Sequence, residues 1–243
     1  MTSRQLSFDL PSRPALGRDD FFVSPANAQA VGLIESWQSW PEGKLILAGP
    51  PGAGKTHLAH VWAEFTGADI VEARDLAARD IPALASGALA VEDVDRICAD
   101  ADAEKTVFHL HNLMQAARHP LLLTAARPPN YWPLDLADLA SRMQATPAVF
   151  LQPPDDALLA AVVMKLMSDR QLLPTVDTIP YLTRRMDRSF DAARHLVEAM
   201  DRTALEEGCA INRALAARVL DKMDPEMQTS SPSRYTGPDK RQS

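Results

Sequence analysis

The chain has 243 residues, 46% of them hydrophobic and 23% charged, and a formal net charge of −7 at pH 7. This length accommodates one large domain or a medium one with a small one, and the composition excludes a chain that is disordered throughout. The negative charge argues against sequence-independent nucleic-acid binding by the whole surface, although a local basic patch would survive that average. No apolar run approaches the ~20 residues of a membrane span, so we expect a cytoplasmic protein without a membrane partner. Cys98 and Cys209 are far apart and indicate neither a disulfide framework nor a zinc site.

Short apolar segments alternate with helical segments over the first two thirds of the chain. Strands are predicted at 44–49, 68–73, 88–93, 119–126 and 147–152. Helical spacing of apolar residues is clear at 26–40, 55–65 and 102–117. Buried strands that alternate with helices predict an α/β fold, in which helices cover both faces of a parallel sheet.

The strand pattern stops after Pro153 and Pro154, and only helical segments follow. These segments lie at 155–170, 175–186, 189–207 and 212–223. We therefore predict an α/β domain over residues 21–154 and a helical domain over residues 155–223. Residues 1–20 are expected to form a flexible arm, and residues 224–243, rich in Ser, Pro, Arg and Asp, a disordered tail.

A phosphate-binding loop is predicted between the first strand and its helix, where GPPGAGKT fits the pattern G-x-x-x-x-G-K-[ST]. Its glycines let backbone N–H groups turn toward phosphate oxygens, and the following helix presents its N-terminus to the anion. Lys55 is expected to reach the β- and γ-phosphates, and the Thr56 hydroxyl to ligate Mg²⁺. A glycine-rich turn without a ligand is the alternative, which the correctly placed Lys-Thr pair disfavours. The predicted site for ATP or ADP comprises Gly49, Pro50, Pro51, Gly52, Ala53, Gly54, Lys55 and Thr56.

Two acids follow the strand predicted at 88–93, as a nucleotide-hydrolysing site requires. Glu92 would hold Mg²⁺, often through water, and Asp93 would orient the attacking water. Taken alone, the pair fits a polar connecting loop equally well. The phosphate loop upstream favours the catalytic interpretation.

These residues resemble the AAA+ ATPases, and more closely the DnaA-related branch of that family. The resemblance runs from residue 22 to about residue 223. It includes GPPGAGKTHL, the paired acids, TAARPPN at 124–130 and DLASRM at 138–143. It implies an AAA+ sheet domain followed by a helical lid. Within that branch, the chain is most similar to regulators that act with the DNA sliding clamp to switch DnaA off.

The resemblance implies roles for four further residues. Arg142, in DLASRM, matches the arginine finger that reaches ATP held by a neighbouring protein, and Arg188 matches the second-sensor contact to phosphates. Asn27 matches the adenine-side segment, and His57 extends the nucleotide-binding loop. Purely structural roles are the alternatives: either arginine can be a surface residue paired with a carboxylate, and Asn27 can be a helix cap.

Two positions depart from the DnaA pattern. Glu92 stands where DnaA has Asp, which shifts the carboxylate geometry. Ala126 stands at the first-sensor position, where DnaA has a polar residue, and Thr124 is two residues back on the same strand. Both changes predict a weak ATPase activity in the chain's own site. Nucleotide binding is expected to persist because Lys55 and Thr56 are present.

The hexapeptide QLSFDL at residues 5–10 resembles the sliding-clamp-binding peptides of replication proteins. An extended peptide of this kind buries Leu6, Phe8 and Leu10 in an apolar pocket while Gln5 bonds at its edge. A short edge strand, or a tail with chance hydrophobic residues, is the alternative. Residues 224–243 are too few for a helix-turn-helix module, so origin binding of the DnaA kind is not expected.

The expected function is negative regulation of replication initiation, through hydrolysis of DnaA-bound ATP. The expected partners are the sliding clamp (β subunit) of DNA polymerase III and DnaA, with DNA reached only through the clamp. Two alternatives stay open: a self-assembling AAA+ ATPase, such as a helicase loader or remodeller, and a clamp-bound adaptor whose nucleotide is purely structural. A small-molecule kinase is disfavoured by the helical region. DNA binding through that region is disfavoured by the acidic balance, although residues 165–171 and 182–188 are basic.

Overall fold

The computed structural model describes residues 22–230, with side chains described up to residue 223. The chain divides into two compact units, Met1–Pro153 (unit 1) and Pro154–Ser243 (unit 2), and each is described by itself. The predicted arm at 1–20, with its clamp peptide at 5–10, lies outside the described residues, as do residues 231–243 of the predicted tail. Over the described part, no helix is both long and apolar enough to cross a membrane.

Unit 1 is built on a five-stranded parallel sheet, which confirms the predicted α/β fold. Its strands are β1 (Lys44–Ala48), β2 (Asp69–Glu72), β3 (Leu89–Glu92), β4 (Leu121–Ala125) and β5 (Ala148–Phe150). They lie in the order β2-β3-β4-β1-β5, and every neighbouring pair is parallel. Each predicted strand is present but shorter by one to three residues in total at its ends. β1 and β4 are buried along their whole length, as strands covered on both faces must be.

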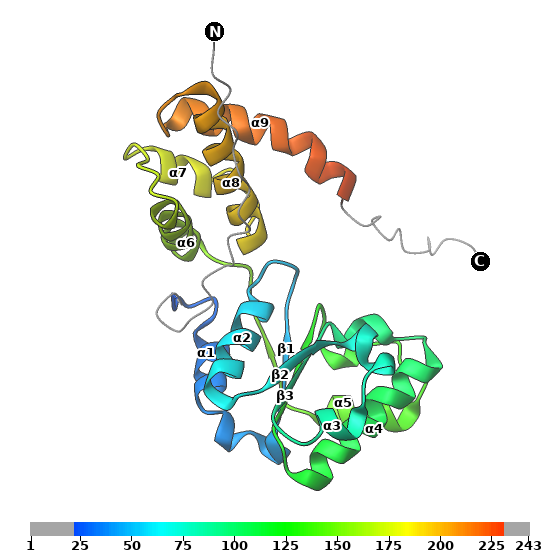
Figure 1. Ribbon diagram of the computed structural model, residues 1–243. Coiled ribbons are helices and arrows are strands. Elements are labelled where there is room, and N and C mark those ends of the chain that lie inside the picture. The colour runs from blue at the N-terminus through cyan, green and yellow to red at the C-terminus, as the bar shows by residue number, and fades with distance from the viewer. Residues whose placement is uncertain (1–21, 231–243) are drawn as a thin grey trace, which may run out of the picture. The chain divides into compact units, whose positions relative to one another are not determined.

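Helices cover both faces of this sheet (Figure 1). One face carries α1 (Ala28–Glu35) and α2 (Lys55–Thr66), and the other carries α3 (Ile81–Leu84), α4 (Ala101–Ala117) and α5 (Ala137–Ala145). Successive side chains of a strand point to opposite faces. Accordingly, Leu45 and Leu47 pack with α1 and α2, while Ile46 packs into the cluster that contains α4.

The helix predicted over 26–40 is present as α1, but its predicted extent is wrong. The structure divides this segment into α1 and one 3₁₀ turn, η2 (Trp37–Ser39), and a second 3₁₀ turn, η3 (Pro41–Gly43), follows it. The Ser36 hydroxyl donates to the Gly32 carbonyl at 2.7 Å, a local bond that competes with helix propagation. The remaining 3₁₀ turns of unit 1 are η4 (Ala73–Ala78), η5 (Val94–Ile97) and η6 (Pro129–Tyr131).

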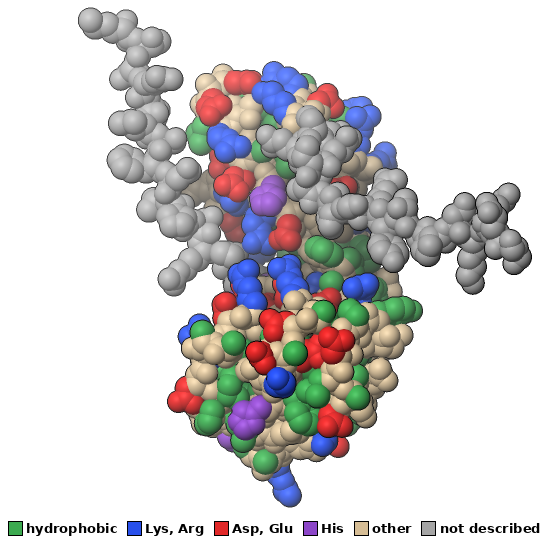
Figure 2. Space-filling view, turned by 90° about the vertical axis from the view of Figure 1, so that its right-hand side faces the viewer, with side chains coloured by type: hydrophobic (Ala, Val, Ile, Leu, Met, Phe, Trp, Pro, Cys, Tyr) green, Lys and Arg blue, Asp and Glu red, His purple; other side chains and the backbone are tan. Residues whose placement is uncertain are grey.

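Unit 2 consists, over its described residues, of four helices around their own core. They are α6 (Asp156–Asp169), α7 (Thr178–Thr183), α8 (Phe190–Glu207) and α9 (Arg213–Ser230). Side-chain caps begin three of them: Asp155 accepts from the Leu158 N–H, Ser189 from the Ala192 N–H, and Asn212 from the Leu215 N–H. Acidic and basic side chains are interspersed on the face of this unit drawn in Figure 2.

Two predicted helix boundaries in unit 2 need correction. α7 is shorter than the predicted 175–186, because the Thr175 hydroxyl bonds to the side chains of Asp177 and Thr178 and organises a turn ahead of the helix. α9 continues to Ser230, whereas a disordered tail was predicted from residue 224. Residues 226–228, Glu-Met-Gln, are good helix formers, and the proline at 225 does not end the helix.

Candidate nucleotide site

The loop between β1 and α2 has the backbone that the sequence motif requires. Gly52 has φ 72° and Gly54 has φ 96°, a left-handed region that other residues rarely adopt. Gly49 lies tight against the end of β5: a Cβ atom there would meet the Leu151 carbonyl oxygen at 2.8 Å. The three glycines therefore serve two needs, a left-handed turn and a close strand-to-strand approach.

Lys55 and Thr56 begin α2 at the open side of this loop. The Lys55 ammonium donates to the carbonyl oxygens of Gly49 (2.8 Å) and Pro50 (3.1 Å), and the residue is only 9% exposed. The cation is therefore held within the loop. Thr56 is exposed and His57 is half-buried.

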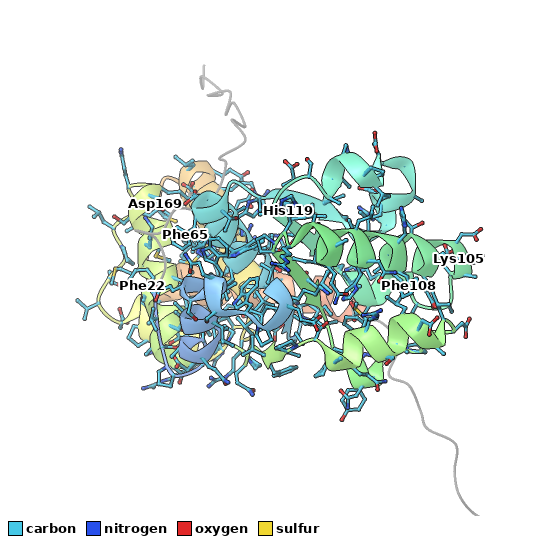
Figure 3. The ribbon with its side chains drawn as sticks, turned by 90° about the horizontal axis from the view of Figure 1, so that it is seen from below. Phe22, Phe65, Lys105, Phe108, His119 and Asp169 are labelled. Atoms are coloured by element: carbon cyan, nitrogen blue, oxygen red, sulfur yellow. The ribbon has the colours of Figure 1, made fainter. Side chains whose placement is uncertain are left out.

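Glu92 ends β3 on the side of the sheet that carries α2. Ala90 and Leu122 pack in the cluster of α1 and α2, so strand alternation places Glu92 and Thr124 on that same side. The two sides are distinct in Figure 3, where Phe65 of α2 and Phe108 of α4 lie far apart across the molecule. The Oε1 atom of Glu92 is buried and has no hydrogen-bond partner among the described residues. A buried, unpaired carboxylate oxygen suits a cation or a bound water.

Asp93 is fixed by its backbone and by a neighbouring arginine. It adopts φ 55°, its N–H donates to the Thr124 hydroxyl oxygen at 3.0 Å, and its Oδ2 lies 3.1 Å from the Arg96 Nε. The Thr124 hydroxyl keeps its own proton available, so β4 contributes a hydroxyl group beside both acids.

Asp95 is a residue of this edge that the sequence interpretation missed. Its Oδ2 accepts from the Ala126 N–H at 3.1 Å, and its Oδ1 is buried without a partner among the described residues. The Asp95 carboxylate therefore contacts the backbone of Ala126, whose own side chain is only a methyl group. Asp95 lies two residues beyond the predicted acid pair, and this spacing was the available signal.

Arg142 lies at the opposite edge of the sheet from the phosphate loop. α5 leads directly into β5, whose first residue pairs with Ile46 in the middle of β1. Arg142 lies further back in α5 and is linked through Gln115 to Glu42, two residues ahead of the start of β1. The phosphate loop leaves the other end of β1. The five residues of β1 separate the two edges by roughly 16 Å, at ~3.3 Å per residue. The Arg142 guanidinium is exposed and donates to the Gln115 Oε1 at 3.2 Å.

The structure gives Arg188 and Asn27 local partners. In unit 2, the Arg188 Nη2 lies 2.7 Å from the Asp156 Oδ1, with both side chains more than half exposed. In unit 1, Asn27 is buried, and its side chain accepts from the Ser24 N–H at 2.8 Å and donates to the Phe22 carbonyl at 2.9 Å. Asn27 therefore holds the turn before α1. It occupies the N-cap position without making a side-chain capping bond.

The residues at this edge fit a magnesium–nucleotide ligand. The loop offers a turned backbone and an ammonium group for phosphate oxygens, and β3 offers a carboxylate oxygen that has no partner among residues 22–223. What is missing is a free polar side chain at position 126 to place an attacking water. The arrangement is better suited to binding than to rapid turnover.

A five-stranded parallel sheet in this order, followed by a helical unit, is the architecture of AAA+ domains. Domain III of the replication initiation protein DnaA from Thermotoga maritima has this fold, with a TM-score of 0.76, 16% identity, and coverage of 88% of this chain and 98% of that one. AMPPCP-bound DnaA from Aquifex aeolicus gives 0.66 at 15% identity, over 89% of this chain and 71% of that one. A RuvB variant from Thermotoga maritima gives 0.61 at 18% identity, over 82% and 68%. No protein-family model matches the sequence. At these identities the likeness establishes the fold.

Proposed function

We propose that the chain is a DnaA-related AAA+ protein of the Hda type, a negative regulator of chromosomal replication initiation. It binds ATP or ADP with Mg²⁺ through the phosphate loop. It binds the DNA sliding clamp through residues 5–10, and it promotes hydrolysis of ATP held by DnaA by supplying Arg142 in trans. Asn27 and Arg188 are proposed as further nucleotide contacts, on the adenine side and the phosphate side.

The placement of Arg142 carries this proposal. The guanidinium is exposed at one edge of the sheet, and the chain's own phosphate loop leaves the other edge. From this position the guanidinium cannot contact a nucleotide bound to its own unit. We therefore propose that it contacts the γ-phosphate of a nucleotide bound to a neighbouring protein. An arginine finger supplied in trans accelerates phosphoryl transfer by roughly 10³–10⁵-fold, because it neutralises charge that grows in the transition state.

The chain's own nucleotide is proposed to have a supporting role. Ala126 brings no polar side chain to the γ-phosphate side, and Asp93 is paired with Arg96 at 3.1 Å. Turnover in this site is therefore slow, while Lys55 and Thr56 retain binding. Two of the similar structures, both of DnaA, contain AMPPCP, an ATP analogue, which supports nucleotide binding by this fold.

Attachment to the clamp gives the proposed activity its timing. A clamp loaded on DNA marks replication that has begun, and tethering raises the local concentration of the regulator without new contacts to DnaA. DNA is then reached only through the clamp. Gln5, Leu6, Phe8 and Leu10 are the proposed contacts to the clamp.

A self-assembling ATPase is the second candidate, because an exposed Arg142 would serve a second copy of this chain equally well. That function requires ATP-dependent oligomers and appreciable turnover by the isolated protein. Sedimentation with and without ATP, combined with a steady-state ATPase assay, distinguishes it from the regulatory function.

The test is hydrolysis of DnaA-bound ATP in the presence of clamp-loaded DNA. The wild-type chain is expected to stimulate hydrolysis, and Arg142→Ala to lose the stimulation by at least ~10²-fold, within the range for a trans arginine. A double variant, Gln5→Ala with Leu6→Ala, is expected to lose stimulation only when the clamp supplies the tether. Absence of stimulation by the wild-type chain contradicts the regulatory function.

A further inference from the structure

Arg142 of α5 is the last member of a polar chain that runs through four elements of unit 1, the other three being α4, η3 and β1. Its Nη1 donates to the Gln115 Oε1 of α4 at 3.2 Å, and the Gln115 Nε2 donates to the Glu42 Oε2 at 3.3 Å. The same Glu42 oxygen lies 3.5 Å from the ammonium of Lys44, the first residue of β1. Arg142 and Gln115 are 27 positions apart in the sequence, and Gln115 and Glu42 are 73 apart, so only the fold brings them together.

The chemistry of the two ends fixes the orientation of the Gln115 amide. A carboxylate only accepts hydrogen bonds and a guanidinium only donates them. The amide NH₂ must therefore face Glu42 and the amide oxygen must face Arg142. Reversing the amide would break both contacts at once, so the side chain has a single favourable orientation between its two neighbours.

The far end of this chain is anchored in the sheet. Lys44 is 1% exposed, and among the described residues Glu42 is the one carboxylate within ion-pair distance of its ammonium. Burial lowers the pKa of Lys44, and the neighbouring Glu42 opposes that shift. Glu42 itself stands in a turn with φ 51°, immediately before Gly43 with φ 70°. A buried cation and a tight turn therefore hold the carboxylate that orients Gln115.

α4 also holds the other end of α5. The carboxylate of Glu104, which is 0% exposed, accepts from the backbone N–H groups of Asp135 and Leu136 at 2.8–3.2 Å. Leu136 is the N-cap residue of α5, the helix that carries Arg142. One helix thus fixes where α5 begins and contacts the functional side chain near its end.

We propose that Gln115 is a positioning residue for Arg142, holding the exposed guanidinium ready for the phosphate of a neighbouring protein's nucleotide. Glu42, anchored by Lys44, sets the orientation of Gln115. This inference rests on the proposed function, and it adds that the finger is organised before the partner arrives. Misplacement of a reacting group by about 1 Å can cost ~10²-fold in rate, so losing a positioning contact should be measurable.

Gln115→Met tests the inference, because methionine keeps the length of the side chain but removes both hydrogen bonds. The assay is hydrolysis of DnaA-bound ATP with clamp-loaded DNA, measured against the concentration of the full-length variant. We expect the maximal rate to fall roughly 10-fold, while the half-saturating concentration stays unchanged, because Gln115 orients Arg142 without holding the partner. Gln144→Met, an exposed glutamine on α5, is the matched control and is expected to behave as wild type.

The double variant Gln115→Met with Arg142→Ala distinguishes an effect of Gln115 through Arg142 from an effect on the reaction that does not depend on Arg142. If Gln115 acts through Arg142, the double variant is expected to be no slower than Arg142→Ala alone. Additive losses in the double variant would overturn the inference. The inference would also be overturned if Gln115→Met kept a rate within about twofold of wild type while Arg142→Ala abolished the reaction. That result would leave the proposed function intact. An inactive wild-type chain instead overturns the proposed function itself.

Discussion

At the scale of single residues, α4 buries two titratable side chains with contrasting surroundings. Glu104 is fully buried and its carboxylate accepts three backbone N–H groups, so its charge is well compensated. His111 is 2% exposed, and neither ring nitrogen has a hydrogen-bond partner within the described residues. Burial, reinforced by the positive charges of Lys44 and Arg142, lowers the pKa of His111 to about 4.

This low pKa predicts an acid-sensitive contribution to stability. In the unfolded chain, His111 takes up a proton near its ordinary pKa of about 6.5, whereas the folded protein keeps it neutral down to about pH 4. The unfolded state therefore binds more protons between these values, and the free energy of unfolding falls as pH drops through this window. We expect His111→Leu to reduce the loss between pH 7 and pH 4.5 by about 2 kcal/mol.

Denaturant unfolding followed by tryptophan fluorescence measures this contribution, because all tryptophans of the chain lie in unit 1. Comparing the two proteins at each pH cancels the carboxylates that titrate in the same range. Parallel pH profiles for the wild type and His111→Leu would show that His111 is protonated in the folded state as readily as in the unfolded state.

At the scale of secondary-structure elements, β1 connects the two functional edges of the sheet. Lys44 at its start anchors the polar chain that ends at Arg142, and the phosphate loop begins directly after Ala48. All five residues of β1 are buried between β4 and β5. The loop and the arginine therefore share one rigid support.

The close approach of the β1 and β5 ends predicts that Gly49→Ala disrupts the phosphate loop. The new methyl group would meet the Leu151 carbonyl oxygen at 2.8 Å and its Cβ at 3.1 Å, so the loop backbone has to move. We expect at least a roughly 10-fold loss of affinity for a fluorescent ATP analogue, because the loop binds through backbone N–H groups that must stay in place.

Gly32→Ala in α1 is the matched control, because a Cβ atom there meets nothing within 4 Å. Replacing this helical glycine is expected to leave nucleotide affinity unchanged and to raise stability by about 0.5–1 kcal/mol. Wild-type affinity in Gly49→Ala would mean that the loop can shift without loss of its ligand.

The sequence predicted the sheet and the phosphate loop because both are local signals. The strands are short apolar runs, and GPPGAGKT specifies its own backbone. The break after α1 was missed because a serine side chain bonding to its own helix overrode the apolar spacing. The contacts of Asp95 and Gln115 were not predictable, since their partners lie 27 to 73 residues away and are assembled only by the fold.

At the scale of the whole molecule, the proposed function gives different roles to two nucleotides, one on this chain and one on DnaA. The chain's own site, with its loop and its buried Glu92 oxygen, is suited to holding ATP or ADP with Mg²⁺. Arg142, at the other edge of the sheet, is suited to completing the site of another protein. The central claim is therefore that the ATP hydrolysed is held by DnaA, and the ATP on this chain is not the one consumed.

A single-turnover experiment with γ-labelled ATP in one site at a time tests this claim directly. Label is loaded on DnaA with unlabelled ATP on this chain, or the reverse, and phosphate release is followed after mixing with clamp-loaded DNA. The account predicts rapid release from labelled DnaA, slowed at least ~10²-fold by Arg142→Ala, and slow release from the labelled chain. Faster release from the labelled chain than from DnaA, or release from DnaA that Arg142→Ala leaves unchanged, would contradict it.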